Sequence, residues 1–348
     1  MPKILFGISP IGLGHATRGL VLSDELRRRG AEVRLFSGGK AAEFMTAQGV
    51  PVSSIVDDPV PRVRNGEMSR VALWYVRSWF ANRRTIPRTR RLFDSYSPDI
   101  VVCDEEFSGM LVAQERGCKR VFITDELLLG FARTWLARTI ERRVERWYSR
   151  LLESADLLIV PEPGQDGGNR RHVGPIVRAV TKTCDDTRRE YGIPAGRMVL
   201  FATSGSGIGR ELALKLRTAL MGSNLRDVSL VITGNRGPKL SGDGVLDLGL
   251  VPDNQNLVAC ADLVVSTAGK STIDEATASG TPIIVIPILH HAEQERNASV
   301  LGYSSSDVPR LSDLVAAKIG KRVQPRSFSG ELVASRAILS LLGGTSEA

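Results

Sequence analysis

A glycine-rich turn near the amino terminus carries the first residues that could do chemistry. It reads GLGHATR, with Gly12 and Gly14 before His15 and Arg18. Glycines let a backbone approach a ligand closely, and the helix that follows offers amide donors and a partial positive charge. The turn predicts an anion or acceptor loop faced by His15; a glycine turn with a capping histidine is the alternative. A dinucleotide site is disfavoured, because Thr17 replaces the third glycine of GxGxxG.

A second glycine loop reads TSGSGIGR and follows the apolar run MVLFA. Its Gly205 and Ser206 would offer backbone and hydroxyl donors to an anion at the start of the next helix. We therefore expect this loop to approach a phosphate group.

The segment STAGKST is not a P-loop, because Val264 occupies the position at which that motif needs a glycine. It still predicts a strand-to-helix turn, with Ser271 and Thr272 near the helix start and Glu275 one turn on. Hydroxyls there suit phosphate, and a carboxylate suits two sugar hydroxyls. Capping roles for Thr272 and Glu275 are the alternative.

A fourth loop reads HHAEQERNA and follows the apolar run PIIVIPIL. It places His291, Glu293, Gln294 and Asn297 on a turn and first helical turn. Adjacent acid and amide side chains can accept from and donate to the vicinal hydroxyls of a hexose. In isolation the pattern is also typical of a solvated helix start.

The elements that must position these loops alternate between short apolar runs and helical patterns, which predicts parallel strands with crossover helices. The alternation restarts after a stretch rich in proline and glycine. We expect an α/β fold of two doubly wound, Rossmann-like domains facing across a cleft, with the motifs at the carboxyl ends of strands. The expected boundaries are an amino-terminal domain at 1–165, a linker at 166–178, a carboxyl-terminal domain at 179–330, and a packing helix at about 330–343.

The composition is that of a globular protein with an excess of positive charge. The 348 residues are 42% hydrophobic and 24% charged, with a formal net charge of +8. This charge favours anionic partners. The longest apolar run is far shorter than the roughly 20 residues of a spanning helix, and the amino terminus lacks a signal-peptide pattern, so we expect a cytoplasmic protein.

The four cysteines are far apart and form no CxxC pair. This spacing argues against a zinc site and against a disulfide framework, so we expect buried or incidental thiols. The sequence also lacks a D-x-D motif that would hold a divalent metal. No metal and no cofactor are therefore expected.

Together the four loops resemble the GT-B glycosyltransferases, specifically the MurG-like branch that includes diacylglycerol galactosyltransferases. The resemblance runs through most of the chain and is most telling in GLGH and in STAGKSTIDEATASGTPIIVIPILHHAEQERNA. The run PIGLGH has one glycine fewer than the fuller run of MurG. The family's nucleotide-sugar block is matched here by Ala268, Gly269, Glu275, Gly280, Pro282, His291, Glu293, Gln294, Asn297 and Ala298.

The resemblance implies a role for each matched position. Glu275 would bind the ribose hydroxyls, Ser271 and Thr272 the diphosphate, and Glu293 with Gln294 the donor hexose. The second glycine loop would approach the diphosphate through Gly205 and Ser206, the backbone of Val251 would contact the nucleobase, and Ala268, Gly269 and His291 belong to the same donor block.

The family implies inverting, metal-independent transfer of a hexose or N-acetylhexosamine from a UDP-sugar to an acceptor hydroxyl. Helix starts and hydroxyls would stabilise the departing diphosphate. A base must take the acceptor proton, and His15 leads because a neutral histidine suits that work. Asp104, Glu105 and Asp125 follow, because they stand just after the apolar runs IVVC and VFIT.

The acceptor side is marked by arginines mixed with aromatic residues in 62–91 and in FARTWLARTIERRVERWYSRLL. This mixture suits an anionic membrane surface. It favours a lipid-linked or lipid acceptor and a peripheral position on the inner face of the cell membrane; an ordinary basic, solvated face is the alternative. Nucleic acid is not an expected partner, since no binding module is present.

Two other functions fit the same loops. A UDP-sugar 2-epimerase shares the architecture and needs no second substrate, and a nucleotide-sugar-binding regulator needs no turnover. The GLGH loop and the basic, aromatic face favour transfer over both.

Overall fold

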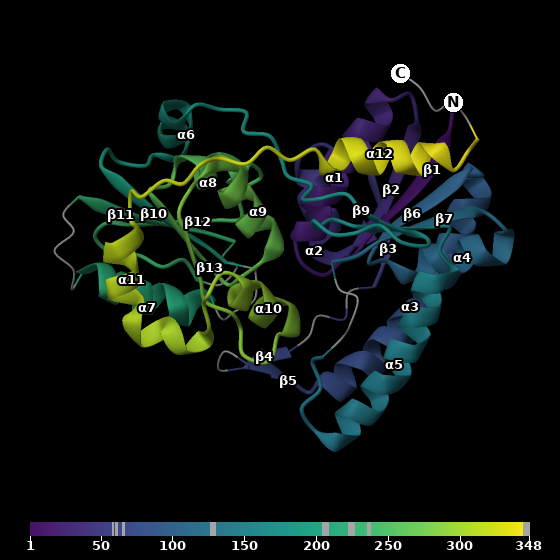
Figure 1. The fold of residues 1–348 in the computed structure, drawn as a ribbon, viewed down its shortest axis with the longest axis horizontal. Helices are drawn as coiled ribbons and strands as arrows, with labels where there is room; N and C mark the ends of the chain where they lie inside the picture. Colours follow the sequence, from purple (N-terminus) through teal and green to yellow (C-terminus); the bar gives the residue numbers. More distant parts are fainter. Residues whose placement is uncertain are drawn as a thin grey trace. The chain divides into compact units, whose positions relative to one another are not determined.

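The structure is a computed structural model in which the chain forms two compact units (Figure 1). Unit 1 comprises Met1–Pro61, Arg70–Val177 and Phe328–Ala348, and unit 2 comprises Arg62–Ser69 and Arg178–Ser327. The structure describes residues 1–57, 59, 62–64, 67–125, 130–203, 209–221, 227–234 and 238–343.

Unit 1 is built on a seven-stranded parallel sheet in the order β3-β2-β1-β6-β7-β8-β9. Chain order runs one way from β1 to β3 and the other way from β6 to β9, so β1 and β6 are neighbours at the switch point. Ligands of open α/β sheets bind at the carboxyl ends of the strands at such a point. The strands are β1 (Lys3–Ile8), β2 (Glu32–Gly38), β3 (Val52–Val56), β6 (Ile100–Asp104), β7 (Lys119–Ile123), β8 (Leu157–Val160) and β9 (Arg170–His172).

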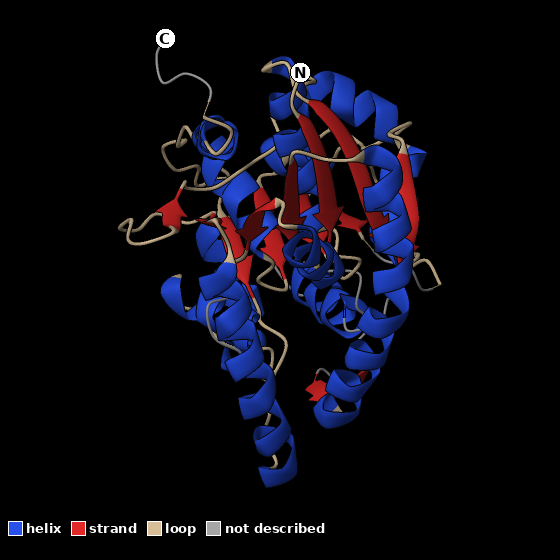
Figure 2. Ribbon diagram, turned by 90° about the vertical axis from the view of Figure 1, so that its right-hand side faces the viewer, coloured by secondary structure: helices blue, strands red, loops and turns tan. Residues whose placement is uncertain are grey.

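Helices cover both faces of this sheet, as Figure 2 shows with helices in blue and strands in red. Alternate strand residues enter opposite cores, for example Phe6 on one face and Leu5 on the other, as the period of two in a strand requires. One face packs α1 (Gly14–Arg28), α2 (Gly39–Ala47) and α12 (Gly330–Ser340), and the other packs α3 (Val71–Tyr96), α4 (Phe107–Arg116) and α5 (Trp135–Ser154).

Unit 2 has a five-stranded parallel sheet in the order β12-β11-β10-β13-β14, with its switch point between β10 and β13. The strands are β10 (Arg197–Ala202), β11 (Val228–Thr233), β12 (Val245–Gly249), β13 (Leu263–Ser266) and β14 (Ile283–Val285). The helices are α6 (Cys184–Tyr191), α7 (Gly209–Met221), α8 (Asn254–Cys260), α9 (Lys270–Ser279), α10 (Ala292–Val300) and α11 (Leu311–Lys318), with a 3-10 turn at Ser305–Arg310. A hairpin of β4 (Arg62–Arg64) and β5 (Glu67–Ser69) is also grouped with this unit. Two parallel α/β sheets confirm the predicted fold class.

One expectation about the cysteines is wrong. Cys184, which begins α6, and Cys260, which ends α8, form a disulfide with their Cα atoms 5.1 Å apart. The two residues are 76 positions apart in sequence, and only the packing of α6 on α8 brings them together. Cys103 and Cys118 are free thiols, as expected.

No helix in the described part of the chain is both long and apolar enough to cross a membrane.

Candidate active site

The turn before α1 takes its shape from its glycines. Gly12 has φ +79°, a left-handed conformation that disfavours any residue with a Cβ atom, and Gly14 is the first residue of α1. Leu13 at the N-cap position makes no side-chain hydrogen bond to this helix, and the first turn has no acidic residue. His15 and Arg18 lie three residues apart on α1, so their side chains share one face of the helix.

His15, Arg18 and Asp104 form one hydrogen-bonded group at the carboxyl ends of β1 and β6. Asp104 Oδ1 lies 2.8 Å from His15 Nδ1. Arg18 donates to both carboxylate oxygens of Asp104, from Nη2 at 2.6 Å and from Nε at 2.8 Å. From Nη1, Arg18 also donates to both oxygens of Asp125 at 2.7 Å. The structure therefore brings four of the predicted residues together.

The charges of this cluster fix its protonation. Burial alone would lower the pKa of His15, but the carboxylates of Asp104 and Glu105 outweigh burial and raise that pKa to about 9. Burial would raise the pKa of Asp104, but Arg18 and His15 hold it at about 2. At neutral pH, His15 is consequently an imidazolium and Asp104 an ionised anchor.

Three consecutive acidic residues at the end of β6 do three different things. Asp104 is the buried anchor. Glu106 caps α4 by accepting from the amides of Ser108 at 2.9 Å and Gly109 at 2.7 Å. Between them, Glu105 has φ +47°, a left-handed conformation that is uncommon outside glycine and is often found at functional sites.

The side chain of Glu105 is held in place but remains 23% exposed. Its Oε1 accepts from Thr124 Oγ1 at 2.7 Å, and that hydroxyl lies 2.9 Å from the hydroxyl of Tyr148. Its Oε2 lies 3.6 Å from Nε2 of His15. Burial raises the pKa of Glu105, while the charge of His15 opposes the rise. Neither Thr124 nor Tyr148 was predicted from the sequence. Thr124 directly follows β7 and Tyr148 lies on α5, so only the fold brings them to Glu105.

In unit 2, the turn between β13 and α9 presents an uncapped helix start. Ala268 has φ +61° and is buried, and Gly269 occupies the N-cap position without a side-chain hydrogen bond. The carboxamide of Asn297 donates to the carbonyl of Ala268 at 3.1 Å, which ties this turn to α10. Ser271 and Thr272 lie in the first turn of α9 and are partly exposed.

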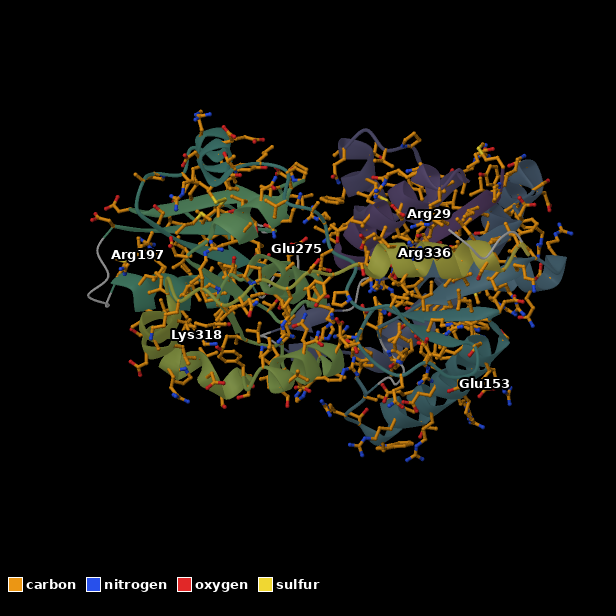
Figure 3. The ribbon with its side chains drawn as sticks, turned by 45° about the horizontal axis from the view of Figure 1, so that its top comes forward. Arg29, Glu153, Arg197, Glu275, Lys318 and Arg336 are labelled. Carbon is orange, nitrogen blue, oxygen red and sulfur yellow. A yellow bond between two sulfur atoms is a disulfide. The ribbon has the colours of Figure 1, made fainter. Side chains whose placement is uncertain are left out.

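Glu275, which is labelled in Figure 3, lies one turn further on. Its side chain is 6% exposed. Its Oε1 is 3.0 Å from both Nε and Nη2 of Arg178. Arg178 also donates from Nη1 to the carbonyl of Pro252 at 2.6 Å. Burial raises the pKa of Glu275, while the charge of Arg178 opposes the rise. Arg178 was not foreseen, because it ends the stretch predicted as a linker.

The start of α10 holds the fourth predicted loop. His291 is the N-cap residue, and burial lowers its pKa to about 4, so its imidazole is neutral at neutral pH. Glu293 is partly exposed in the first turn. Gln294 is only 4% exposed, and its Oε1 accepts from the amide of Ile288 at 3.0 Å. The side chain of Gln294 thus braces the segment before the helix.

Three predicted donor residues remain: Val251, Gly205 and Ser206. Val251 is 6% exposed, and its side chain belongs to the apolar core around α8, so a ligand could reach only its backbone. Gly205 and Ser206 lie outside the described residues.

Two family models match the chain. Residues 13–185 match a glycosyl transferase 4-like domain, and residues 243–306 match the glycosyltransferase family 28 C-terminal domain. The first span contains the cluster around Arg18, and the second contains the starts of α9 and α10. With the two Rossmann-like sheets, these matches define the class: the chain belongs to the GT-B glycosyltransferases.

Within that class the chain is similar to MurG-like enzymes, which confirms the predicted resemblance. It is 25% identical over 340 residues to the UDP-N-acetylglucosamine--N-acetylmuramyl-(pentapeptide) pyrophosphoryl-undecaprenol N-acetylglucosamine transferase of Nocardioides sp., covering 92% of this chain and 88% of that protein. An uncharacterized glycosyltransferase of Methanosarcina acetivorans is 25% identical over 320 residues, covering 86% and 83%. Among solved structures, S. aureus MnaA with UDP aligns with a TM-score of 0.66 at 14% identity, covering 100% of this chain and 99% of that chain.

Proposed function

We propose that the protein transfers a hexose or N-acetylhexosamine from a UDP-sugar to an acceptor hydroxyl, with inversion at the anomeric carbon. The observation that carries the proposal is the cluster of His15, Arg18, Asp104, Glu105 and Asp125 at the switch point of unit 1. A nucleotide-sugar donor is supported by the name of the relative from Nocardioides sp..

The donor would bind to unit 2. The uncapped start of α9 offers amides and the hydroxyls of Ser271 and Thr272 to a diphosphate, whose leaving charge a helix amino terminus stabilises. Glu275 would accept from the ribose hydroxyls, with its orientation fixed by Arg178. The backbone of Val251 would contact the base, and Glu293 with Gln294 and His291 would lie nearest the sugar.

The acceptor would be activated by unit 1. An imidazolium cannot take a proton, so the base in this proposal is the carboxylate of Glu105, and His15 orients it and stabilises its charge. Asp104, Asp125 and Arg18 position His15. In the chemical step, the acceptor oxygen bonds to the anomeric carbon as the carbon–oxygen bond to the diphosphate breaks. The acceptor proton passes to Glu105, and UDP leaves.

We test the function first by donor selection. UDP-, GDP- and dTDP-sugars are screened by thermal shift, since a ligand that binds only the folded state raises the melting temperature. We expect UDP-sugars to give the largest shift, and the selected donor to release UDP only when an acceptor is added. Conversion of UDP-N-acetylglucosamine to its 2-epimer without acceptor would instead establish the epimerase, and binding without any turnover would establish a regulator.

We further propose that the acceptor is lipid-linked or membrane-associated. Helices α3 and α5 pack together in unit 1 and combine arginines with exposed apolar side chains. One arginine, Arg83, lies 4.4 Å from the ring centre of Trp79. Such a surface suits an anionic lipid interface. The exposed apolar residues are Leu73, Val76, Trp79, Phe80, Trp135, Leu136 and Trp147.

Replacing both Trp135 and Leu136 by alanine is expected to reduce binding to anionic vesicles at least about tenfold, because these side chains are 78% and 52% exposed and would enter the lipid interface. Vesicle flotation measures the bound fraction. Val300→Ala in unit 2 is the matched control, since Val300 is 81% exposed. The membrane proposal is wrong if the wild type shows no preference for anionic over neutral vesicles.

A further inference from the structure

Lys270 occupies a position at which its charge is unfavourable. It is the first residue of α9, where the helix dipole places partial positive charge. Within the described residues, the backbone amides of Lys270, Ser271 and Thr272 donate to no acceptor. A cation beside three unsatisfied donors is the opposite of what helix stability favours.

Among the described residues, the partner of the Lys270 ammonium is Asp274, one turn further along α9. Its Nζ lies 2.6 Å from Oδ1 and 2.5 Å from Oδ2. The order, with the cation amino-terminal to the anion, is the less stabilising one for a helix. The two side chains are only 17% and 13% exposed, so the pair also loses much of its hydration. Stability of α9 therefore does not account for this lysine.

A second observation at the same turn points to a ligand. The side chain of Thr267, which begins the turn, is 1% exposed, and its hydroxyl has no hydrogen-bond partner in the part of the chain that the structure describes. Buried hydroxyls are ordinarily satisfied. Ligand oxygens would satisfy the hydroxyl and the amides and would offset the charge of Lys270.

We propose that Lys270 is a diphosphate-binding residue, and that its ammonium moves from Asp274 to the phosphate oxygens when the nucleotide binds. This inference rests on the proposed function and adds to it a charged side chain at the leaving group. Lysine binds phosphate as a point charge on a flexible stem, which allows the exchange. In the absence of nucleotide, Asp274 holds the ammonium of Lys270. Asp274 itself makes no contact with the nucleotide.

The test is calorimetric binding of uridine, UMP and UDP to the full chain and to Lys270→Gln. We expect the variant to bind UDP about ten- to a hundredfold more weakly, the worth of one charge-assisted contact, and to bind uridine as the wild type does. Asp274→Asn should bind UDP at least as tightly as the wild type. The matched control is Lys215→Gln, which removes a lysine from a similarly spaced but exposed ion pair with Glu211 on α7.

The outcomes of this experiment distinguish a failure of the Lys270 assignment from a failure of the proposed function. If Lys270→Gln binds UDP within twofold of the wild type, or loses uridine and UDP equally, Lys270 does not bind the diphosphate, and the proposed function stands. If the wild type binds none of the three nucleotides, the UDP donor is wrong, and the assignment of Lys270 fails with it.

Discussion

Glu105→Gln is expected to lower kcat about 10²- to 10⁴-fold, the range for losing a general base, while the affinity for the donor stays unchanged. The amide keeps the shape of the side chain and can still contact Thr124, but it cannot take the acceptor proton. Donor affinity is preserved because the proposed donor residues belong to unit 2. Turnover is measured as UDP release with acceptor, and donor binding by calorimetry.

The pH dependence gives a second readout of the same variant. Because the pKa of Glu105 lies above its ordinary value of 4.5, kcat should rise with pH along a limb displaced upward from that value. Residual activity of Glu105→Gln should lack this limb. Glu115→Gln, on the exposed side of α4, is the control and should behave as the wild type. A Glu105→Gln enzyme within threefold of wild-type kcat would exclude Glu105 as the base.

Arg18→Met is expected to lower the free energy of unfolding by about 3–5 kcal/mol, because it removes the guanidinium that two largely buried carboxylates share and leaves Asp104 with His15 as its cation. Arg18 is 9% exposed, and Asp104 and Asp125 are 0% and 11% exposed. Urea denaturation measures the change. Arg116→Met is the control; Arg116 and its partner Asp94 are 42% and 51% exposed, so the change should stay within about 0.5 kcal/mol.

The pH dependence of this loss of stability follows from the pKa of Asp104. A carboxyl whose folded pKa is held at about 2 stabilises the protein above its unfolded pKa of about 3.9, and this contribution disappears as pH falls toward 2. The contribution of Asp104 to wild-type stability should therefore be full above pH 4 and shrink below it, and the difference between wild type and Arg18→Met should decrease as the pH falls toward 2. A difference under 1 kcal/mol at neutral pH would contradict the role of Arg18 as the counterion of both carboxylates.

Much of the fold can be predicted from local patterns in the amino-acid sequence. The alternation of apolar runs and helical segments fixed two parallel sheets, because each strand buried on both faces reads as a continuous apolar run. The loops with His15 and Glu275 could be found because glycine and polar residues after such runs mark the carboxyl ends of strands. Arg18 joined Asp104 and Asp125 because their loops follow three adjacent strands.

What could not be predicted depends on long-range contacts. The disulfide and the pairing of Arg178 with Glu275 join segments 76 and 97 residues apart, and nothing local marks either partner. The separate roles of three consecutive acids at the end of β6 depend on long-range partners: Glu105, with its φ of +47°, contacts Thr124 and the second ring nitrogen of His15. A count of acidic residues carries no such information.

The central claim is that unit 1 activates an acceptor while unit 2 binds a UDP-sugar. The most direct measurement is donor affinity and transfer rate, taken together, for the wild type, Glu105→Gln and Glu275→Gln. The account predicts that Glu105→Gln keeps donor affinity and loses transfer, whereas Glu275→Gln loses donor affinity. Equal loss of both quantities in both variants, or full activity in either, would contradict it.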